Sequence, residues 1–157
     1  MIFCSREDAK RTAQIANIEE MSAAVVDCAF KLHKDLGPGL LESAYEMLLA
    51  AKLVALGLKV DRQVTINIDY DGIHIENAFR IDMIVNDKLL VEIKSTENYS
   101  PVHAKQLLTY LRLTNRPLGL LINFGFPTFR EGIRRLVNNH TDFASSRLRA
   151  NNLDTPP

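Results

Sequence analysis

Apolar residues recur every three or four positions along the first third of the chain, which is the pattern of amphipathic helices. The pattern predicts one helix from about residue 7 to residue 36, where Gly37-Pro38-Gly39 ends it. A second helix is expected from about residue 41 to residue 56, ending near Gly57. The positions that define the first helix are Ile18, Met21, Val25, Ala29 and Leu32.

The pattern changes to strict alternation between residues 60 and 70, which is typical of a half-buried strand. Asp71-Gly72 is a strong signal for a tight hairpin turn, so a second strand is expected from residue 73 to residue 85. A third strand is expected from residue 89 to residue 95. These runs therefore predict two consecutive hairpins.

The rest of the chain returns to helix and then to strand. Ser100 and Pro101 mark the start of a helix that runs to about residue 113, because serine suits the cap and proline the first turn. The apolar run at residues 117–124 predicts a buried strand. Residues 129–137 fit either a short helix or an edge strand, and the pattern alone does not decide between them.

This order of elements predicts a mixed β-sheet with helices packed on it, an α/β domain rather than a doubly wound one. The domain is expected to span residues 18–138. Residues 1–17 would form an N-terminal helical extension, and residues 139–157 a polar tail that is expected to be mobile.

Two of the predicted strands carry charged residues within apolar runs. Asp82 interrupts one strand, and Glu92 and Lys94 interrupt the next. An acid buried among apolar neighbours is unfavourable unless its charge is compensated. The simplest explanation is that the two acids share a bound cation.

The length of the loop between these strands tests this interpretation. A three-residue loop at Asn86-Asp87-Lys88 places Asp82 opposite Glu92, with Lys94 on the same face. A two-residue loop would shift the register by one residue and send the two acids to opposite faces. The residues expected on the other face are Ile81, Met83, Val91 and Ile93.

Plainer explanations exist for each of these residues. Glu-x-Lys is a common tripeptide, and charged residues in strands often protect an exposed edge. In the second helix, Glu42 lies in the first turn, where the helix dipole favours a carboxylate. Three residues later comes Tyr45, which is more often a core residue than a catalytic one.

The helix that begins at Ser100 presents a second group of polar residues. Gln106 and Tyr110 are four residues apart and share one face with His103. A buried glutamine usually satisfies a backbone group, and a lone helical histidine is usually structural. The position of this group directly after the Glu-x-Lys strand makes it a candidate for the same site.

Composition limits the classes of protein that fit. The chain has 157 residues, enough for one domain with a sizeable core, and no apolar run approaches the length of a membrane span. No signal-peptide core follows Met1, and the two cysteines, Cys4 and Cys28, form no metal or redox motif. We therefore expect a cytoplasmic protein with free thiols and no membrane partner.

The formal net charge of zero hides an asymmetry. Residues 1–100 hold 11 basic and 16 acidic residues, a net charge of −5, whereas residues 101–157 hold 8 and 3, a net charge of +5. A basic C-terminal part is compatible with a phosphate-rich partner and equally with a solvated surface. The arginines responsible are Arg130, Arg134, Arg135, Arg147 and Arg149.

Taken together, these motifs resemble the GxxExxY proteins of the PD-(D/E)XK nuclease superfamily. The name-giving motif stands here as Gly39-Leu40-Leu41-Glu42-Ser43-Ala44-Tyr45. The resemblance covers about residues 18–138 and implies a restriction-endonuclease-like core. The other matching segments are Phe79-Arg80-Ile81-Asp82, Val91-Glu92-Ile93-Lys94, Pro101 to Leu111, and Leu120-Leu121-Ile122-Asn123-Phe124.

The resemblance implies a metal site. In that superfamily the acids at the positions of Asp82 and Glu92 bind a divalent cation, and a helical glutamate, here Glu42, often completes the metal shell. Oxygen ligands alone suit Mg²⁺ or Mn²⁺ better than zinc.

The resemblance also implies roles for residues around the metal. The lysine at the position of Lys94 helps to position or activate the attacking water. The Gln-x-x-x-Tyr pattern of Gln106 and Tyr110 is similar to one that flanks the site in RecB-like nucleases.

Three hypotheses follow. The first is a metal-dependent nuclease that hydrolyses phosphodiester bonds, of DNA rather than RNA. The second is a catalytically silent nucleic-acid-binding or oligomeric scaffold module on the same fold. The third, compatible with the first, is a homo-oligomer that forms through the long N-terminal helix.

Overall fold

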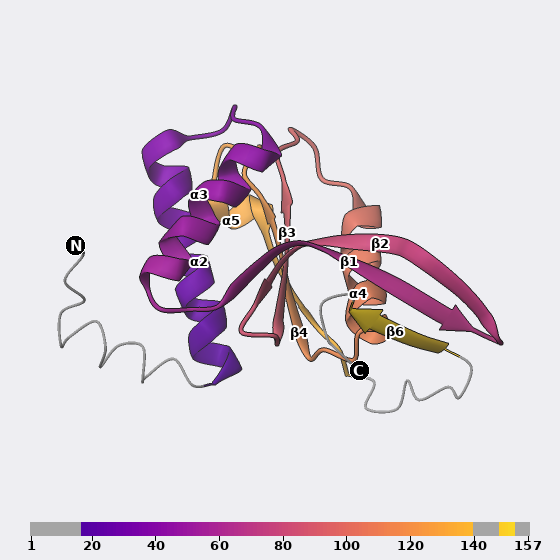
Figure 1. Ribbon diagram of the computed structural model, residues 1–157. Helices are drawn as coiled ribbons and strands as arrows, with labels where there is room; N and C mark the ends of the chain where they lie inside the picture. Colours follow the sequence, from indigo (N-terminus) through magenta and orange to yellow (C-terminus); the bar gives the residue numbers. More distant parts are fainter. Residues whose placement is uncertain (1–16, 140–147, 153–157) are drawn as a thin grey trace.

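The computed structural model describes residues 17–139 and the backbone of residues 148–152. The chain forms an α/β fold in which helices cover both faces of one sheet (Figure 1). The expected helix over residues 7–16 and most of the expected N-terminal extension lie outside the described residues. The helices are α2 (Ile18–Leu36), α3 (Glu42–Ala55), α4 (Pro101–Leu113) and α5 (Phe129–Gly132), and the strands are β1 (Val60–Tyr70), β2 (Ile73–Val85), β3 (Leu89–Lys94), β4 (Leu118–Asn123), β5 (Ile133–Val137) and β6 (Leu148–Asn152).

The six strands form one mixed sheet in the order β5-β4-β3-β2-β1-β6. Among the described strands, only β3 and β4 run parallel, and α4 makes the crossover between them. All other neighbours are antiparallel. The expected mixed sheet flanked by helices is therefore confirmed.

Two hydrophobic clusters hold helices on the opposite faces of the sheet. The first cluster packs α2, α3 and α5 on β2, β3 and β4, and Met21, Val25 and Leu49 are among its buried residues. The second packs α4 on the other face through Leu107 and Leu111. The boundary signals of α2 also act as expected, since Asn17 Oδ1 accepts from the Glu20 N–H and Gly37 ends the helix with a φ of 67°.

Both predicted turns have the expected chemistry. Asp71 and Gly72 have φ angles of 48° and 78°, and a two-residue type I′ hairpin turn requires positive φ at both of its central residues. At the other hairpin Val85 pairs with Leu89, so the loop has three residues and the predicted register is confirmed. That loop also depends on left-handed backbone, at Asn86 and Asp87.

One expected face is wrong. Met83 packs against α2 and α3 as expected, but Ile81 packs with Val64 in the cluster beneath α4. The change of face occurs between them, where the pairing of β1 with β2 skips Gln63 and Asp82 and Gln63 has a φ of 52°. The left-handed residue breaks the regular alternation of the strand, which a sequence pattern does not reveal.

The C-terminal part contains elements that the sequence analysis left open or did not predict. Residues 129–137 contain both of the alternatives, because helix α5 is followed directly by edge strand β5. Within the expected polar tail, residues 148–152 form strand β6, which pairs with the outer edge of β1. Pairing with a strand that is distant in the sequence leaves no local signal.

Among the described residues, no helix has the length and hydrophobicity needed to cross a membrane.

Candidate active site

A cavity of about 470 Å³ lies where α3, the β1–β2 hairpin, β3 and α4 meet. All six residues selected from the sequence line it, although they come from four different elements. They are Glu42, Asp82, Glu92, Lys94, Gln106 and Tyr110. His103, the other candidate on α4, is not among the residues that line this cavity.

The two acids of adjacent strands are joined through the backbone. The Asp82 main-chain N–H donates to Glu92 Oε1 at 3.3 Å, and the Ile93 N–H donates to Asp82 Oδ2 at 2.9 Å. The paired register of β2 and β3 ends at Met83 and Val91, one residue before the acids. The carboxylates therefore bridge the two strands at the point where the regular ladder stops and the cavity opens.

Burial and repulsion act on the same carboxyl group. Glu92 is only 6% exposed, and desolvation followed by the charge of Asp82 raises its pKa from 4.5 to about 8. A hydrogen bond from the backbone of Asp82 and the charge of Lys94 lower the pKa by smaller amounts. A divalent cation between the acids would supply the missing positive charge.

Lys94 is half-buried at the end of β3, and the backbone around it is firmly held. Its carbonyl accepts from the Phe124 N–H at 2.8 Å. Just beyond it, the buried Asn123 side chain accepts from the N–H groups of Thr96 and Gly125 at 3.0 and 2.9 Å. The strand that carries Glu92 and Lys94 is thus fixed to the start of the next loop.

Glu42 is the first residue of α3 and lies in the cavity wall. Its Oε1 accepts from the Ser95 N–H at 3.4 Å, and the Ser95 hydroxyl donates to the carbonyl of Leu40 at 2.7 Å. Within the described part of the chain, no three His, Cys, Asp or Glu side chains stand close enough together to hold a metal. The structure brings Asp82 and Glu92 together, and the role of Glu42 as a third metal ligand stays a prediction.

Tyr45 has the structural role that the plainer explanation gave it. The side chain is fully buried and its ring stacks on Phe124 with centroids 4.2 Å apart. Its hydroxyl donates to the carbonyl of Gly37 and accepts from the Leu40 N–H. Tyr45 therefore anchors the loop that leads to Glu42, and Gly39, with a φ of 118°, allows that loop to turn.

On the other side of the cavity, Tyr110 stacks on Phe79 with ring centroids 4.2 Å apart. Desolvation, then the charges of Glu92 and Asp82, raise the pKa of Tyr110, while a hydrogen bond from Gln106 opposes the rise. The hydroxyl therefore stays protonated at neutral pH and can donate a hydrogen bond.

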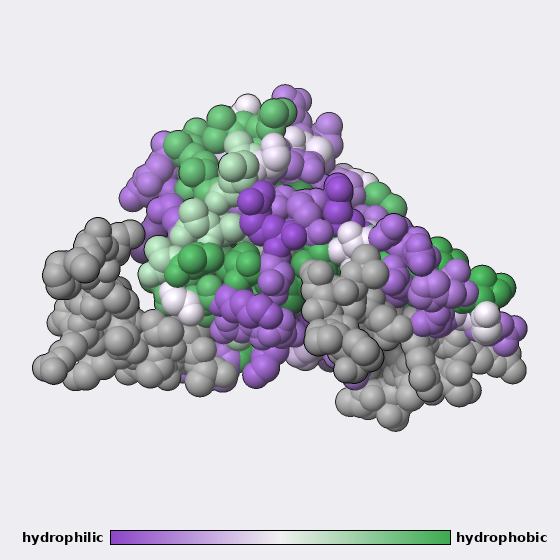
Figure 2. All heavy atoms as spheres, viewed as in Figure 1, coloured by the Kyte–Doolittle hydropathy of each residue, from purple (hydrophilic) through white to green (hydrophobic). Residues whose placement is uncertain are grey.

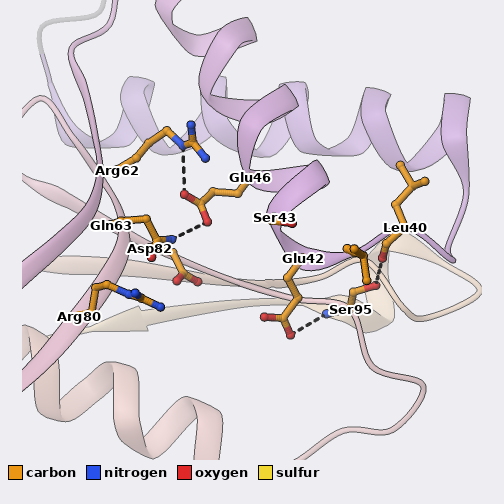
Figure 3. Close-up of a pocket in the computed structure, with 10 residues that line it drawn as sticks. Leu40, Glu42, Ser43, Glu46, Arg62, Gln63, Arg80, Asp82 and Ser95 are labelled. Carbon is orange, nitrogen blue, oxygen red and sulfur yellow. Dashed lines mark hydrogen bonds and ion pairs between the residues drawn. The ribbon is translucent and has the colours of Figure 1, made fainter.

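A second cavity, of about 630 Å³, adjoins the first and shares Glu42, Arg80 and Asp82 with it (Figure 3). Its wall contains a group that the sequence analysis missed. The buried Glu46 accepts from Arg62 Nε at 3.0 Å and from Gln63 Nε2 at 2.7 Å. The spacing of four between Glu42 and Glu46 was a usable signal for a shared helix face, whereas the left-handed Gln63 had none.

A mixed sheet flanked by helices, with paired acids and a lysine on two adjacent strands, defines the restriction-endonuclease-like class of α/β proteins. A family model of the PD-(D/E)XK nuclease superfamily matches residues 19–136, and the chain belongs to that superfamily. No curated protein and no solved structure matched the chain. The narrower resemblance to the GxxExxY proteins stays a prediction.

Proposed function

We propose that this protein is a divalent-metal-dependent nuclease that hydrolyses phosphodiester bonds of DNA, with RNA as the less favoured substrate. The proposal rests above all on the pair formed by Asp82 and Glu92, with Lys94 lining the same cavity. The superfamily supports the reaction class and a nucleic-acid substrate.

The donor set fits Mg²⁺ or Mn²⁺. Magnesium is usually held by one or two carboxylates and keeps several waters or substrate oxygens, so it does not need a cage of protein ligands. Asp82 and Glu92 offer such a pair of carboxylates, and Glu42 lines the same cavity. Bound there, a cation would lower the pKa of a water molecule and offset charge on the phosphate.

The residues around the acids have distinct parts in the proposed reaction. Lys94 lines the same cavity as the two carboxylates, where its ammonium group orients the water and stabilises negative charge on the phosphate. Tyr110 is a neutral donor to a phosphate oxygen, and Gln106 orients the Tyr110 hydroxyl.

The burial of Glu92 favours an enzyme over a silent module. A scaffold gains nothing from a buried carboxyl group whose pKa is raised to about 8 by desolvation and a neighbouring acid. Perturbed titratable groups in a cavity are typical of functional sites.

Cleavage assays test the proposal directly. The full chain is incubated with single-stranded, duplex and branched DNA and with RNA, in Mg²⁺, Mn²⁺ or EDTA. Cleavage should require metal and should be lost in Asp82→Asn, Glu92→Gln and Lys94→Ala. As a matched control, Lys88→Ala changes an exposed lysine in the loop between β2 and β3 and should leave cleavage unchanged.

If no substrate is cleaved and calorimetry detects no Mn²⁺ binding, the silent nucleic-acid-binding module replaces the nuclease. An Asp82→Asn variant that cleaves as fast as the wild type would also overturn the proposed site.

A homo-oligomer remains a compatible second proposal. Apolar surface gathers over α2 and α3, where Phe30 is 47% and Met47 is 57% exposed (Figure 2). Light scattering on the full chain measures whether copies associate, and Phe30→Ser tests whether α2 contributes.

A further inference from the structure

Arg80 lies at the junction of the two cavities and has no role in the metal site described above. It is exposed, lines both cavities and precedes Asp82 by two residues on β2. Figure 3 shows its guanidinium group directed into the space between Asp82 and Glu42. It is therefore a cation at the point that any ligand spanning the two cavities must pass.

The neighbouring acids are engaged elsewhere. Glu46 already accepts from Arg62 and Gln63, and Glu42 accepts from the backbone of Ser95. Within the described part of the chain, Arg80 forms no ion pair or side-chain hydrogen bond of its own. An arginine beside several carboxylates would usually pair with one of them. Because Arg80 does not, its five N–H donors stay available to a ligand.

The chemistry of the site identifies the kind of ligand. A guanidinium group presents a planar fork that matches the oxygens of a phosphate group. The cavities continue on both sides of Arg80 and Asp82, so a chain of linked phosphates fits better than a single small anion.

We propose that Arg80 binds the backbone phosphate next to the scissile phosphodiester and so holds the nucleic-acid strand across both cavities. This inference rests on the proposed nuclease function and adds the path of the substrate. Arg80 is a substrate-binding residue in this scheme and takes no part in activating water.

Binding and cleavage are measured separately to test this inference. The full chain is titrated against a short fluorescein-labelled single-stranded DNA by anisotropy, at several NaCl concentrations, with Ca²⁺ in place of Mg²⁺. Steady-state cleavage of the same oligonucleotide is measured in Mg²⁺. Wild type is compared with Arg80→Gln and Arg80→Lys. The control is Lys88→Gln, which removes an equal charge from the exposed loop between β2 and β3.

Arg80→Gln should weaken DNA binding about 10- to 100-fold, as expected for the loss of hydrogen bonds to a charged group. The slope of log affinity against log salt concentration should become shallower by about one, which corresponds to the loss of one phosphate contact. KM should rise with little change in kcat, because the contact is present before and during the reaction. Arg80→Lys should restore the salt dependence but not the full affinity, since lysine keeps the charge and loses the fork.

The outcomes separate the two proposals. If the wild type binds and cleaves while Arg80→Gln matches Lys88→Gln, the nuclease stands and Arg80 is merely a solvated surface cation. If Arg80→Gln lowers kcat with KM unchanged, Arg80 acts in the chemical step and the strand-holding role is wrong. If the wild type neither binds nor cleaves any nucleic acid, both proposals fail.

Discussion

Desolvation and the charge of Asp82 raise the pKa of Glu92 to about 8, so Glu92 holds a proton at neutral pH when no cation is bound. The unfolded chain gives up that proton with a pKa near 4.5, whereas the folded protein gives it up near 8. Folding therefore favours the protonated carboxyl group, and raising the pH through this range favours the unfolded state.

The first prediction concerns the stability of the protein in EDTA. The free energy of unfolding should decrease from about pH 5 to about pH 8 and then level off, by on the order of 4 kcal/mol for a pKa shift of this size. Urea denaturation at a series of pH values measures this decrease. Glu92→Gln should remove most of it, because the amide has no proton to lose.

Saturating Mn²⁺ should also flatten the pH dependence, because the cation stabilises the ionised pair. A wild-type protein with equal stability at pH 5 and pH 8 in EDTA would show that Glu92 does not hold its proton.

At the level of elements, the left-handed Gln63 in β1 lies where the pairing of β1 with β2 skips Asp82. The buried Glu46 of α3 accepts a hydrogen bond from the Gln63 side chain. Helix α3 thus holds the part of β1 beside Asp82, and it also carries Glu42.

The second prediction follows from that bond. Glu46→Ala removes an acceptor from both Arg62 and Gln63 and should lower the free energy of unfolding by about 2 kcal/mol. It should also weaken Mn²⁺ binding, measured by calorimetry, because β1 loses the contact that fixes it opposite Asp82. Glu76→Ala, an exposed acid on the same hairpin, is the control and should change neither property.

The third prediction concerns the loop that follows β4. A Cβ atom at Gly125 would lie 2.3 Å from the carbonyl oxygen of Thr96, and backbone atoms cannot move aside cheaply. Gly125→Ala should therefore destabilise the protein by about 3 kcal/mol and reduce cleavage, because Thr96 is two residues beyond Lys94. Gly119→Ala meets only the flexible Leu107 side chain, at 3.1 Å, and should cost about 1 kcal/mol in the same urea assay.

Most elements could be predicted from the sequence because their signals are local. Alternation defined β1, the turn at Asp71 located β2, and the interpretation of Asp82 and Glu92 as a shared site predicted the three-residue loop that brings them together. The residues that line the cavity could be predicted because β3 and α4 are consecutive in the chain. The conformation of Gln63 and the pairing of strand β6 could not be predicted, because a left-handed strand residue and a distant pairing depend on tertiary contacts.

At the scale of the whole molecule, β6 pairs with the edge of β1 that would otherwise be unpaired. It pairs with β1 from Ile66 to Tyr70, beyond Arg62 and Gln63, the β1 residues that bond to Glu46 of α3. An unpaired edge strand is prone to pair with other chains.

The fourth prediction concerns a chain that ends at residue 139. It should lose about 2 kcal/mol of stability, since it loses a short strand and leaves the other elements in place. It should also aggregate at high concentration, as light scattering would detect. Full retention of stability and solubility would show that β6 contributes nothing to the edge.

The turn at Asp71 and Gly72 closes a hairpin arm whose residues 71–78 are all exposed. The arm extends away from the helices (Figure 1). The pairing between Val64 and Ile81 lies further along the same two strands, toward the base of the arm. Peptide inserted at this turn would lengthen the arm without changing the register at its base. The tip is therefore a place where a fluorophore, an affinity tag or an additional domain can be attached while the protein keeps its candidate site.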